Sequence, residues 1–387
     1  MVSLSQIQSS NARISSDLPA GLVAVFVGGT GAIGETTMKS FAKHAVSPRI
    51  YFIGWSKEAA TRIQSDLEAV NPAGEYHFIA ADVSLLRSVD DACREIKAKE
   101  RAVNLVHLTS GTVAAGKDTT EGLRYQSAVA YYSRIRFIVN LLPLLQRAPA
   151  LRRVLTVFGG TKEGSLDVND LDSRRVPLGK LRGHLSSTVT LALESLAFEA
   201  PNVSFVHAFP GSVRSKSGVQ RGRRVSSSNG NNSKAMPGAI YGALHSLFAV
   251  PPLLGLGGGT MPFTEAGERQ LFVATSARFP ARYHHHHKSS SSSSSSPVLG
   301  SGDASPGPVN THNNNTTVGV SCPRGVPIAR GTDARGGTGV YSVSYDAETA
   351  PHKVDELLQG LRDRDVVRKL WLHTEEEFVR ATGSAFV

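Results

Sequence analysis

The sequence contains only two cysteines, Cys93 and Cys322, among its 387 residues. Two cysteines cannot supply the disulfide framework of a small secreted protein, so we expect a reducing compartment. Residues 1–19 are polar and rich in serine, without the apolar core of a secretory leader. No stretch reaches the roughly 18 consecutive apolar residues of a membrane span. From these absences we expect a cytoplasmic protein with no membrane span.

Patterns for binding metal or nucleic acid are also lacking. Residues 284–287 are four consecutive histidines, but they lie in a polar tract without carboxylate or thiolate partners, and we expect no metal site. The formal net charge is +10, yet the basic residues are scattered. Their densest group, Arg214 to Arg224, has no interleaved aromatic residues. We therefore expect a solvated basic loop and no nucleic-acid partner, although its charge would attract an anionic cofactor.

A glycine-rich turn near the amino terminus carries the strongest functional signal. The β-forming run 23–27 leads directly into Gly29-x-Gly31-x-x-Gly34, and a helical pattern follows. Glycines let the backbone turn tightly and approach a diphosphate, while the helix amides and dipole stabilise its charge. A tight strand–helix turn without a ligand is the alternative. The strand and helix on either side favour the nucleotide site, because the motif requires both.

The first half of the chain alternates strand and helix patterns joined by short connections. Strands are expected at 23–27, 49–54, 76–80, 103–108, 153–158 and 203–209. Helices are expected at 57–70, 86–96, 121–146 and 180–199, with two more at 239–250 and 265–275. This alternation predicts an α/β fold in three αβα layers, with a doubly wound parallel sheet between helices. A last strand at 337–345 and one amphipathic helix are expected to complete it.

We expect a single domain with two additions. Residues 1–20 are interpreted as a flexible tail, and 21–282 as the nucleotide-binding domain. Residues 283–330, with their serine, histidine and asparagine tracts, are interpreted as a disordered low-complexity insertion. Residues 331–387 would then return to the same domain as its last strand and C-terminal helix.

Taken together, the motifs resemble those of the short-chain dehydrogenase/reductase family. The matching segments are Val27-Gly28-x-x-Gly31-x-x-Gly34, Asp82-Val83, Thr109-Ser110-Gly111, Leu196-Ala-Phe-Glu199 and Pro210-Gly211. In the family, the glycine segment binds the diphosphate and Asp82-Val83 holds the adenine. Thr109-Ser110-Gly111 follows strand four, Leu196-Ala-Phe-Glu199 ends the active-site helix, and Pro210-Gly211 approaches the nicotinamide. The resemblance implies a Rossmann-type fold, an NAD(P)-dependent oxidoreductase and a homodimer formed through two long helices. Segments 131–134, 159–164, 183–184 and 267–278 are similar to a filamentous-fungal branch associated with secondary-metabolite pathways.

The end of strand two bears on the choice of cofactor. An NAD enzyme places a carboxylate there to bind the ribose hydroxyls, but this chain reads Gly54-Trp-Ser-Lys57. Ser56 and Lys57 favour the 2′-phosphate of NADP(H), unless Lys57 merely begins an exposed helix. Trp55 can stack on adenine or cap the sheet edge. The expected cofactor-binding residues are Gly28, Gly29, Thr30, Gly31, Ile33, Gly34, Ser56, Lys57, Asp82, Val83, Ser110, Gly111, Pro210 and Gly211.

The catalytic group departs from the family pattern. The positions of its Tyr-x-x-x-Lys fall on Arg182 and Ser186, and the serine after strand five is missing. His184, Tyr131 and Lys162 are candidate substitutes. The structural alternative is helix packing for His184, aromatic packing for Tyr131 and an ordinary polar loop for Lys162. The apolar segment 251–259 suits a lid over a hydrophobic polyketide or terpenoid, or is a spacer. We expect a ketone/alcohol oxidoreductase; the alternative is a non-catalytic NADP(H)-binding sensor or scaffold.

Overall fold

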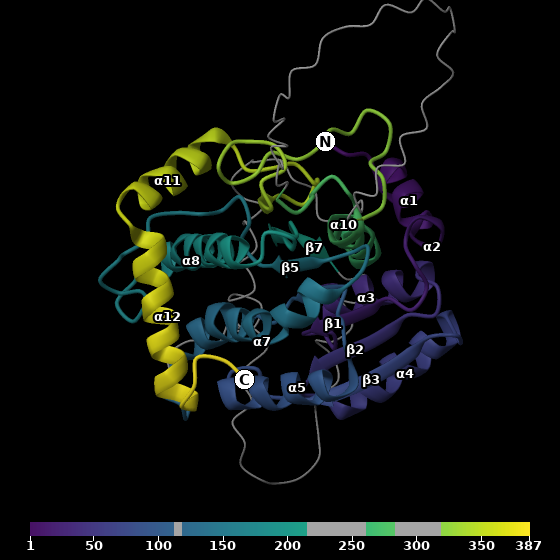
Figure 1. Ribbon diagram of the computed structural model, residues 1–387, viewed down its shortest axis with the longest axis horizontal. Helices are drawn as coiled ribbons and strands as arrows, with labels where there is room; N and C mark the ends of the chain where they lie inside the picture. The colour runs from purple at the N-terminus through teal and green to yellow at the C-terminus, as the bar shows by residue number, and fades with distance from the viewer. Residues whose placement is uncertain (112–117, 215–260, 283–318) are drawn as a thin grey trace, which may run out of the picture.

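The computed structural model describes residues 1–111, 118–214, 261–282 and 319–387, and it contains a seven-stranded parallel sheet (Figure 1). The strands are β1 (Val23–Val27), β2 (Arg49–Gly54), β3 (Glu75–Ala80), β4 (Leu105–Leu108), β5 (Arg153–Val157), β6 (Ser204–Ala208) and β9 (Val340–Val343). Their order is β3-β2-β1-β4-β5-β6-β9. β7 (Val213–Arg214) and β8 (Met261–Pro262) form a separate small pair. The doubly wound sheet predicted from the sequence is confirmed.

Helices cover both faces of this sheet, giving three layers. One face carries α3 (Ala32–His44), α4 (Lys57–Val70) and α10 (Phe263–Thr275); the other carries α5 (Leu86–Lys99), α7 (Ser133–Arg147) and α8 (Leu178–Glu199). Every residue of β1 is buried, with Val25 facing one apolar cluster and Phe26 the other. A continuous apolar run of this kind is what a parallel strand buried on both faces requires.

The helix predicted at 121–146 is interrupted. A short helix, α6 (Tyr125–Ser127), leads into a π-helical turn at Ala128–Tyr132, and α7 starts only at Ser133. A π turn inserts one residue into the helical register and rotates the side chains that follow it. No periodicity of apolar residues signals such an insertion, because Ala128–Tyr132 is buried throughout.

The expected flexible tail at 1–20 is instead folded against the domain. It forms α1 (Leu4–Ala12) and α2 (Ile14–Asp17), and α1 packs on α10. Ser3 and Gln6 form a capping box at the start of α1, and Asn11 donates a hydrogen bond to a carboxylate oxygen of Glu268 at 2.7 Å. Ile7 is fully buried. The serine-rich composition concealed both the cap and this apolar face.

The boundaries expected in the second half also need correction. Residues 319–330 were assigned to the insertion, but Val320 is buried and exchanges backbone hydrogen bonds with Thr275 and Ala277. The C-terminal segment forms two helices, α11 (His352–Asp363) and α12 (Val366–Thr382), separated by Asp365 with a φ of +56°. The basic loop, the helix at 239–250, the segment 251–259 and the histidine run lie outside the described residues.

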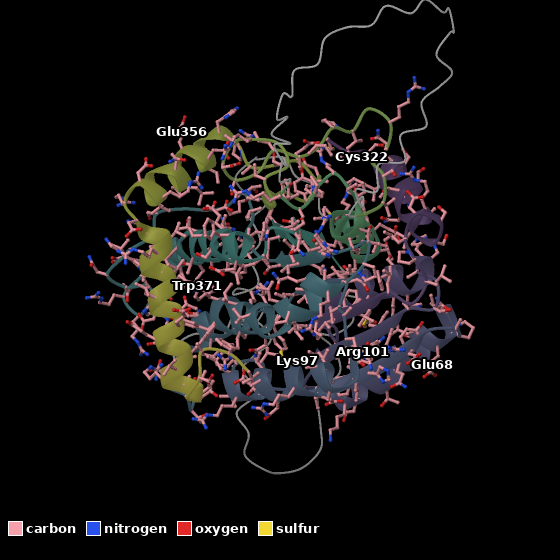
Figure 2. All side chains as sticks on the ribbon, in the orientation of Figure 1. Glu68, Lys97, Arg101, Cys322, Glu356 and Trp371 are labelled. Atoms are coloured by element: carbon pink, nitrogen blue, oxygen red, sulfur yellow. The ribbon has the colours of Figure 1, made fainter. Side chains whose placement is uncertain are left out.

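Both cysteines are free thiols. Cys93 is buried on α5, and burial raises the pKa of its thiol, so it is a poor nucleophile. Cys322 is half-buried in the loop near α1 and α2 (Figure 2). Within the described ranges, no helix is both long and apolar enough to cross a bilayer.

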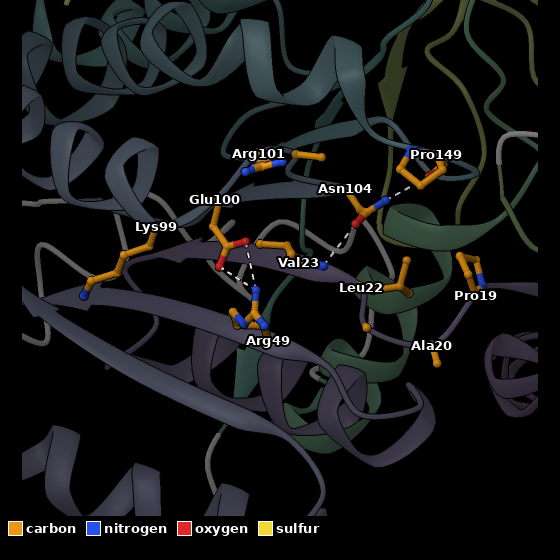
Figure 3. A pocket seen from close by; sticks show the side chains of 12 residues that line it. Pro19, Ala20, Leu22, Val23, Arg49, Lys99, Glu100, Arg101, Asn104 and Pro149 are labelled. Carbon is orange, nitrogen blue, oxygen red and sulfur yellow. Dashed lines mark hydrogen bonds and ion pairs between the residues drawn. The ribbon is translucent and has the colours of Figure 1, made fainter.

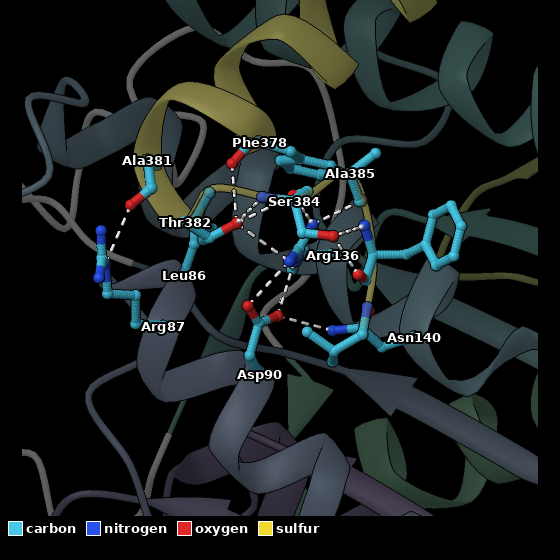
Figure 4. A network of polar contacts seen from close by, with 12 residues as sticks. Leu86, Arg87, Asp90, Arg136, Asn140, Phe378, Ala381, Thr382, Ser384 and Ala385 are labelled. Carbon is cyan, nitrogen blue, oxygen red and sulfur yellow. Dashed lines mark hydrogen bonds and ion pairs between the residues drawn. The ribbon is translucent and has the colours of Figure 1, made fainter.

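The last helix is anchored by a buried ion pair. α12 runs across α8 and α5 (Figure 1), and its Phe378 ring lies 5.0 Å from the guanidinium of Arg136 on α7. Arg136 donates to both carboxylate oxygens of Asp90 at 2.6 and 2.8 Å and also to the backbone oxygen of Ser384 (Figure 4). α12 thus covers parts of α8 and α5. The homodimer implied by the resemblance stays a prediction.

We predict that Asp90→Ala lowers the free energy of unfolding by about 3 kcal/mol, because it leaves the Arg136 charge buried without its counter-ion. Urea denaturation measures this. The matched control is Asp91→Ala, which breaks only the exposed Asp91–Arg94 pair and should cost less than about 0.5 kcal/mol. Equal losses in the two variants would contradict the anchoring role.

Candidate functional site

The predicted cofactor-binding residues and Lys162 lie at one edge of the sheet. All described contacts within the seven-stranded sheet are parallel, so the carboxyl ends of its strands lie together. The chain proceeds outward from β1 through β2 to β3, then returns to pair β4 on the other side of β1. Open α/β sheets bind ligands at such a reversal. The glycine turn that follows β1 lies there.

The glycine turn is shaped by close backbone contacts. Gly28 has a φ of +80°, and a Cβ on it would lie 2.7 Å from the backbone nitrogen of Ser110. A Cβ on Gly34 would lie 2.5 Å from the carbonyl oxygen of Gly28. Gly31, by contrast, has open space around its Cβ position, with only Gly28 O within 4 Å, at 3.8 Å. Gly31 is also the N-cap of α3, with no side chain capping the helix amides. Those amides are therefore available to an anion.

The end of β2 presents exposed and polar groups near this turn. Trp55 is 85% exposed, so it does not cap the sheet edge, and its indole faces solvent. Ser56 is the N-cap of α4, where its hydroxyl oxygen accepts a hydrogen bond from the amide of Ala59 at 3.2 Å. Lys57 is exposed in the first turn of the same helix. Thr30 lies against Gly54, where a Cβ would overlap the threonine hydroxyl.

The remaining predicted cofactor residues follow β3, β4 and β6. Asp82 is exposed, and its carboxylate accepts hydrogen bonds from the backbone and hydroxyl of Ser84 at 2.9 and 2.7 Å. Ser110 is buried without a partner for its hydroxyl among the described residues, and Gly111 is exposed. Gly211, with a φ of +75°, lies against Tyr345: its Cβ position is 3.0 Å from that of the tyrosine. Ile33, Val83 and Pro210 are half-buried at the same edge.

A buried arginine joins the ends of β4 and β5. Arg134 is fully buried, and its guanidinium donates to the carbonyl oxygens of Leu108 at 2.9 Å and Val157 at 3.1 Å. It also contacts the carbonyl of Ser110 and the hydroxyl of Thr156. Burial lowers the pKa of Arg134 to about 9. In the sequence Arg134 is recognisable only as part of the fungal segment 131–134, and no local pattern shows that it, rather than Tyr131, reaches the strand ends.

A hydrogen-bonded cluster fixes the loop that follows β5. The backbone amide of Gly159 donates to Nε2 of His207 at 3.0 Å, so Nδ1 carries the proton and donates to Thr190. Oε1 of Glu163 accepts from Thr190 at 2.8 Å and from Ser342 at 2.6 Å. Burial lowers the pKa of His207 to about 3. His207 is therefore neutral, and its 3.7 Å approach to Glu163 is not an ion pair.

Two of the three catalytic candidates lie in packed interfaces. Tyr131 is buried, and its hydroxyl hydrogen-bonds to Thr374 of α12 at 2.6 Å; burial raises the pKa of this phenol. His184 is buried on α8, where Nδ1 accepts from the amide of Asp167 at 3.3 Å. Burial lowers the pKa of His184. These contacts favour the packing alternative for both residues.

Lys162, the third candidate, lies at the carboxyl edge. It is half-buried, and its Nζ is 4.9 Å from the ring centroid of Phe209, the residue before Pro210. Burial, followed by the charge of Arg182, lowers the pKa of Lys162. The two family positions counted from the sequence also lie here: a Cβ on Gly159 would overlap the Ser186 hydroxyl and lie 4.0 Å from Cγ of Arg182. Arg182 and Ser186 thus lie beside the loop of Lys162 at the carboxyl end of β5, and their place in an active site stays a prediction.

A separate cavity lies at the opposite edge of the sheet (Figure 3). It has a volume of about 400 Å³ and is lined by the amino ends of β1 and β2 with the loops near Glu100, Asn104 and Pro149. Within it, Glu100 accepts from Arg49 at 3.0 Å and from Tyr51 at 2.7 Å, and Lys99 pairs with Glu95. None of the predicted site residues lines this cavity. In the part of the chain that the structure describes, no cluster of potential metal ligands occurs.

Comparison with known proteins places the chain among fungal oxidoreductases. No family model matches the sequence. "Oxidoreductase AN1596" of Emericella nidulans is 34% identical over 383 residues, covering 97% of each chain. "Short-chain dehydrogenase/reductase SAT2" of Stachybotrys chartarum is 31% identical over 221 residues, which are 51% of this chain and 62% of that one. A solved 3-oxoacyl (acyl-carrier-protein) reductase of Agrobacterium tumefaciens, with NADP bound, has a TM-score of 0.47 at 17% identity, covering 68% of this chain and 90% of its own.

The buried carboxyl of Glu163 predicts a pH effect on stability. Burial raises its pKa, so ionisation opposes folding: its contribution is complete below the unfolded-state pKa of about 4.3 and is lost as pH rises through the folded-state pKa. We expect Glu163→Gln to gain stability relative to the unmodified protein as pH rises from about 4 to neutrality. Urea unfolding at several pH values measures the difference. Glu95→Gln, at an exposed pair with Lys99, is the control, and a pH-independent difference for Glu163→Gln would refute the assignment.

Proposed function

Because the chain belongs to a fungal branch of the short-chain dehydrogenase/reductase family, we propose that it binds NADP(H) and interconverts a ketone and an alcohol on a hydrophobic small molecule. The observation that carries this proposal is the glycine turn after β1, which leaves the amides of α3 uncapped at the strand-order reversal. The similarity of segments 131–134, 159–164, 183–184 and 267–278 to the fungal branch supports a role in secondary metabolism. The unpaired cysteines support a cytoplasmic location.

The residues at the carboxyl edge fit a dinucleotide. The open space beside Gly31 leaves room for a diphosphate against the helix amides. The absence of an acidic residue from Gly54-Trp-Ser-Lys57 suits a 2′-phosphate, which Lys57 and the amino end of α4 would attract. Trp55 is exposed enough to stack on the adenine. Asp82 would accept from the adenine amino group, as the family resemblance implies.

The nicotinamide, when bound, supplies a hydride at its C4 atom. The segment Pro210–Gly211 would hold the ring, and the half-buried Lys162 lies near it through its contact with Phe209. A carbonyl that accepts hydride develops negative charge on its oxygen, which a nearby ammonium group stabilises. Of the three catalytic candidates, we therefore propose Lys162 as the group that stabilises this negative charge.

The rival proposal is a non-catalytic NADP(H)-binding sensor or scaffold. It is favoured by one observation: Arg182 and Ser186 occupy the positions that the family gives to tyrosine and lysine, and they lie beside Gly159 where that chemistry would take place. Both proposals require the dinucleotide site and differ only in turnover.

The first test addresses the dinucleotide site. We predict that Gly31→Asp weakens NADPH binding at least about tenfold, or about 1.4 kcal/mol, because its carboxylate would compete with the diphosphate for the α3 amides. Aspartate and asparagine are both good N-caps, so both Gly31→Asp and the uncharged control Gly31→Asn should fold. Titration of NADPH, followed by the intrinsic fluorescence of Trp55 and Trp371, measures affinity, and a parallel NADH titration measures the preference. Unchanged binding by Gly31→Asp would overturn the proposal.

The second test separates enzyme from binding protein. We expect the protein to consume NADPH in the presence of at least one member of a panel of hydrophobic ketones, measured by the loss of reduced-nicotinamide absorbance. Gly31→Asp is the control for consumption that does not use the site. Tight NADPH binding without turnover, together with capture of a specific protein partner, would instead support the sensor or scaffold.

A further inference from the structure

Two cations are brought together at the carboxyl end of β5. Arg182 projects from α8, and Lys162 belongs to the loop that follows the strand. The helix and the loop meet at two glycines: a Cβ on Gly183 would lie 3.0 Å from Cα of Gly164 and 3.8 Å from the carbonyl oxygen of Lys162. The amide of Gly164 also donates to the carbonyl of Gly183 at 3.1 Å. Without side chains at these two positions, the helix approaches close enough to place Arg182 beside the loop.

Neither cation has a carboxylate partner among the described residues. The Lys162 ammonium contacts the Phe209 ring, and the Arg182 guanidinium forms no hydrogen bond or ion pair with any described group. Glu163 is adjacent in sequence, but its Oε1 accepts from two hydroxyls and it does not reach Lys162. The charged groups that face Lys162 are Arg182 of α8, Glu163, Lys353 of α11 and Asp346 of the loop after β9.

Burial and, after it, the charge of Arg182 lower the pKa of Lys162. The two cations are therefore near enough for Arg182 to disfavour the charged form of the ammonium, and an anionic ligand bound beside them would offset that repulsion.

We infer that Arg182 and Lys162 form a binding site for an anionic oxygen, a carboxylate or an enolate, that the substrate carries beside its reacting carbonyl. The inference rests on the proposed function and deepens it. The substrate class is an oxo acid or an enolised 1,3-dicarbonyl compound with an apolar remainder. The guanidinium would form charge-assisted hydrogen bonds to the anionic oxygen, and the ammonium would approach it from the side of Phe209.

The position of the pair supports an anion next to the reaction centre. Lys162 lies over Phe209, which directly precedes Pro210-Gly211, the segment proposed to approach the nicotinamide. Cγ of Arg182 lies 4.0 Å from the Cβ position of Gly159 in the same loop. An oxygen held between the two cations would therefore keep a neighbouring carbonyl carbon near the proposed hydride donor.

A matched pair of probes tests this inference. We expect acetoacetate to bind the full-length, NADP⁺-saturated protein at millimolar concentration, and its neutral methyl ester to bind about tenfold more weakly. Saturation-transfer NMR on the probe's methyl group measures both. Arg182→Met should abolish the preference for the acid, and Arg182→Lys should retain part of it. Lys180→Met is the control, because it removes an exposed cation two residues away on the same helix.

Equal binding of acid and ester, no binding of acetoacetate, or equal loss of preference in Lys180→Met and Arg182→Met would each overturn the inference. The comparison is repeated without cofactor. One outcome is that NADP⁺ does not bind, while the protein still prefers acetoacetate to its methyl ester and Arg182→Met loses that preference. In that case the proposed function fails and the anion site stands. If NADP⁺ binds and the acid preference is missing, the anion site fails alone.

Discussion

The buried guanidinium of Arg134 is the constraint on which the carboxyl edge of the sheet depends. Among the described residues it has no carboxylate partner, and it uses its hydrogen bonds to hold carbonyl groups at the ends of β4 and β5. Carbonyls at strand ends have no ladder partners, so a multidentate donor satisfies several of them at once. The loop carrying Ser110 packs against the glycine turn, and the loop carrying Lys162 begins just after Val157. One side chain thus sets the spacing between the proposed dinucleotide and substrate halves.

Most of the fold could be predicted from sequence because it is encoded locally. The strand at Arg49–Gly54 and the helix at Lys57–Val70 are observed with the expected bounds, since apolar periodicity and flanking turns fix both. The glycine turn was predictable because Gly28 requires a positive φ. The helices at 1–20 were missed because their stability comes from packing on α10, and a serine-rich composition does not show a distant partner.

The sequence indicated the side chains of the candidate site better than the contacts they make. Counting back from Leu196 gave Arg182 and Ser186 as the family positions, and the structure adds that both lie against Gly159. The choice of Tyr131 could not anticipate the π turn at Ala128–Tyr132, which directs the phenol to α12 and Arg134 to the strands. Glu163 is coupled to Thr190 and Ser342, residues far apart in the sequence. Side-chain networks of this kind depend on tertiary distances that no local pattern contains.

The contact between positions 159 and 186 couples two parts of the chain that are distant in sequence. A Cβ on Gly159 would overlap the Ser186 hydroxyl, so a larger residue at 159 requires that hydroxyl to rotate away or residue 186 to change. The same hydroxyl donates to the carbonyl oxygen of Arg182 at 2.7 Å, and rotating it would break this hydrogen bond. Substitutions at 159 and 186 should therefore have non-additive effects on stability.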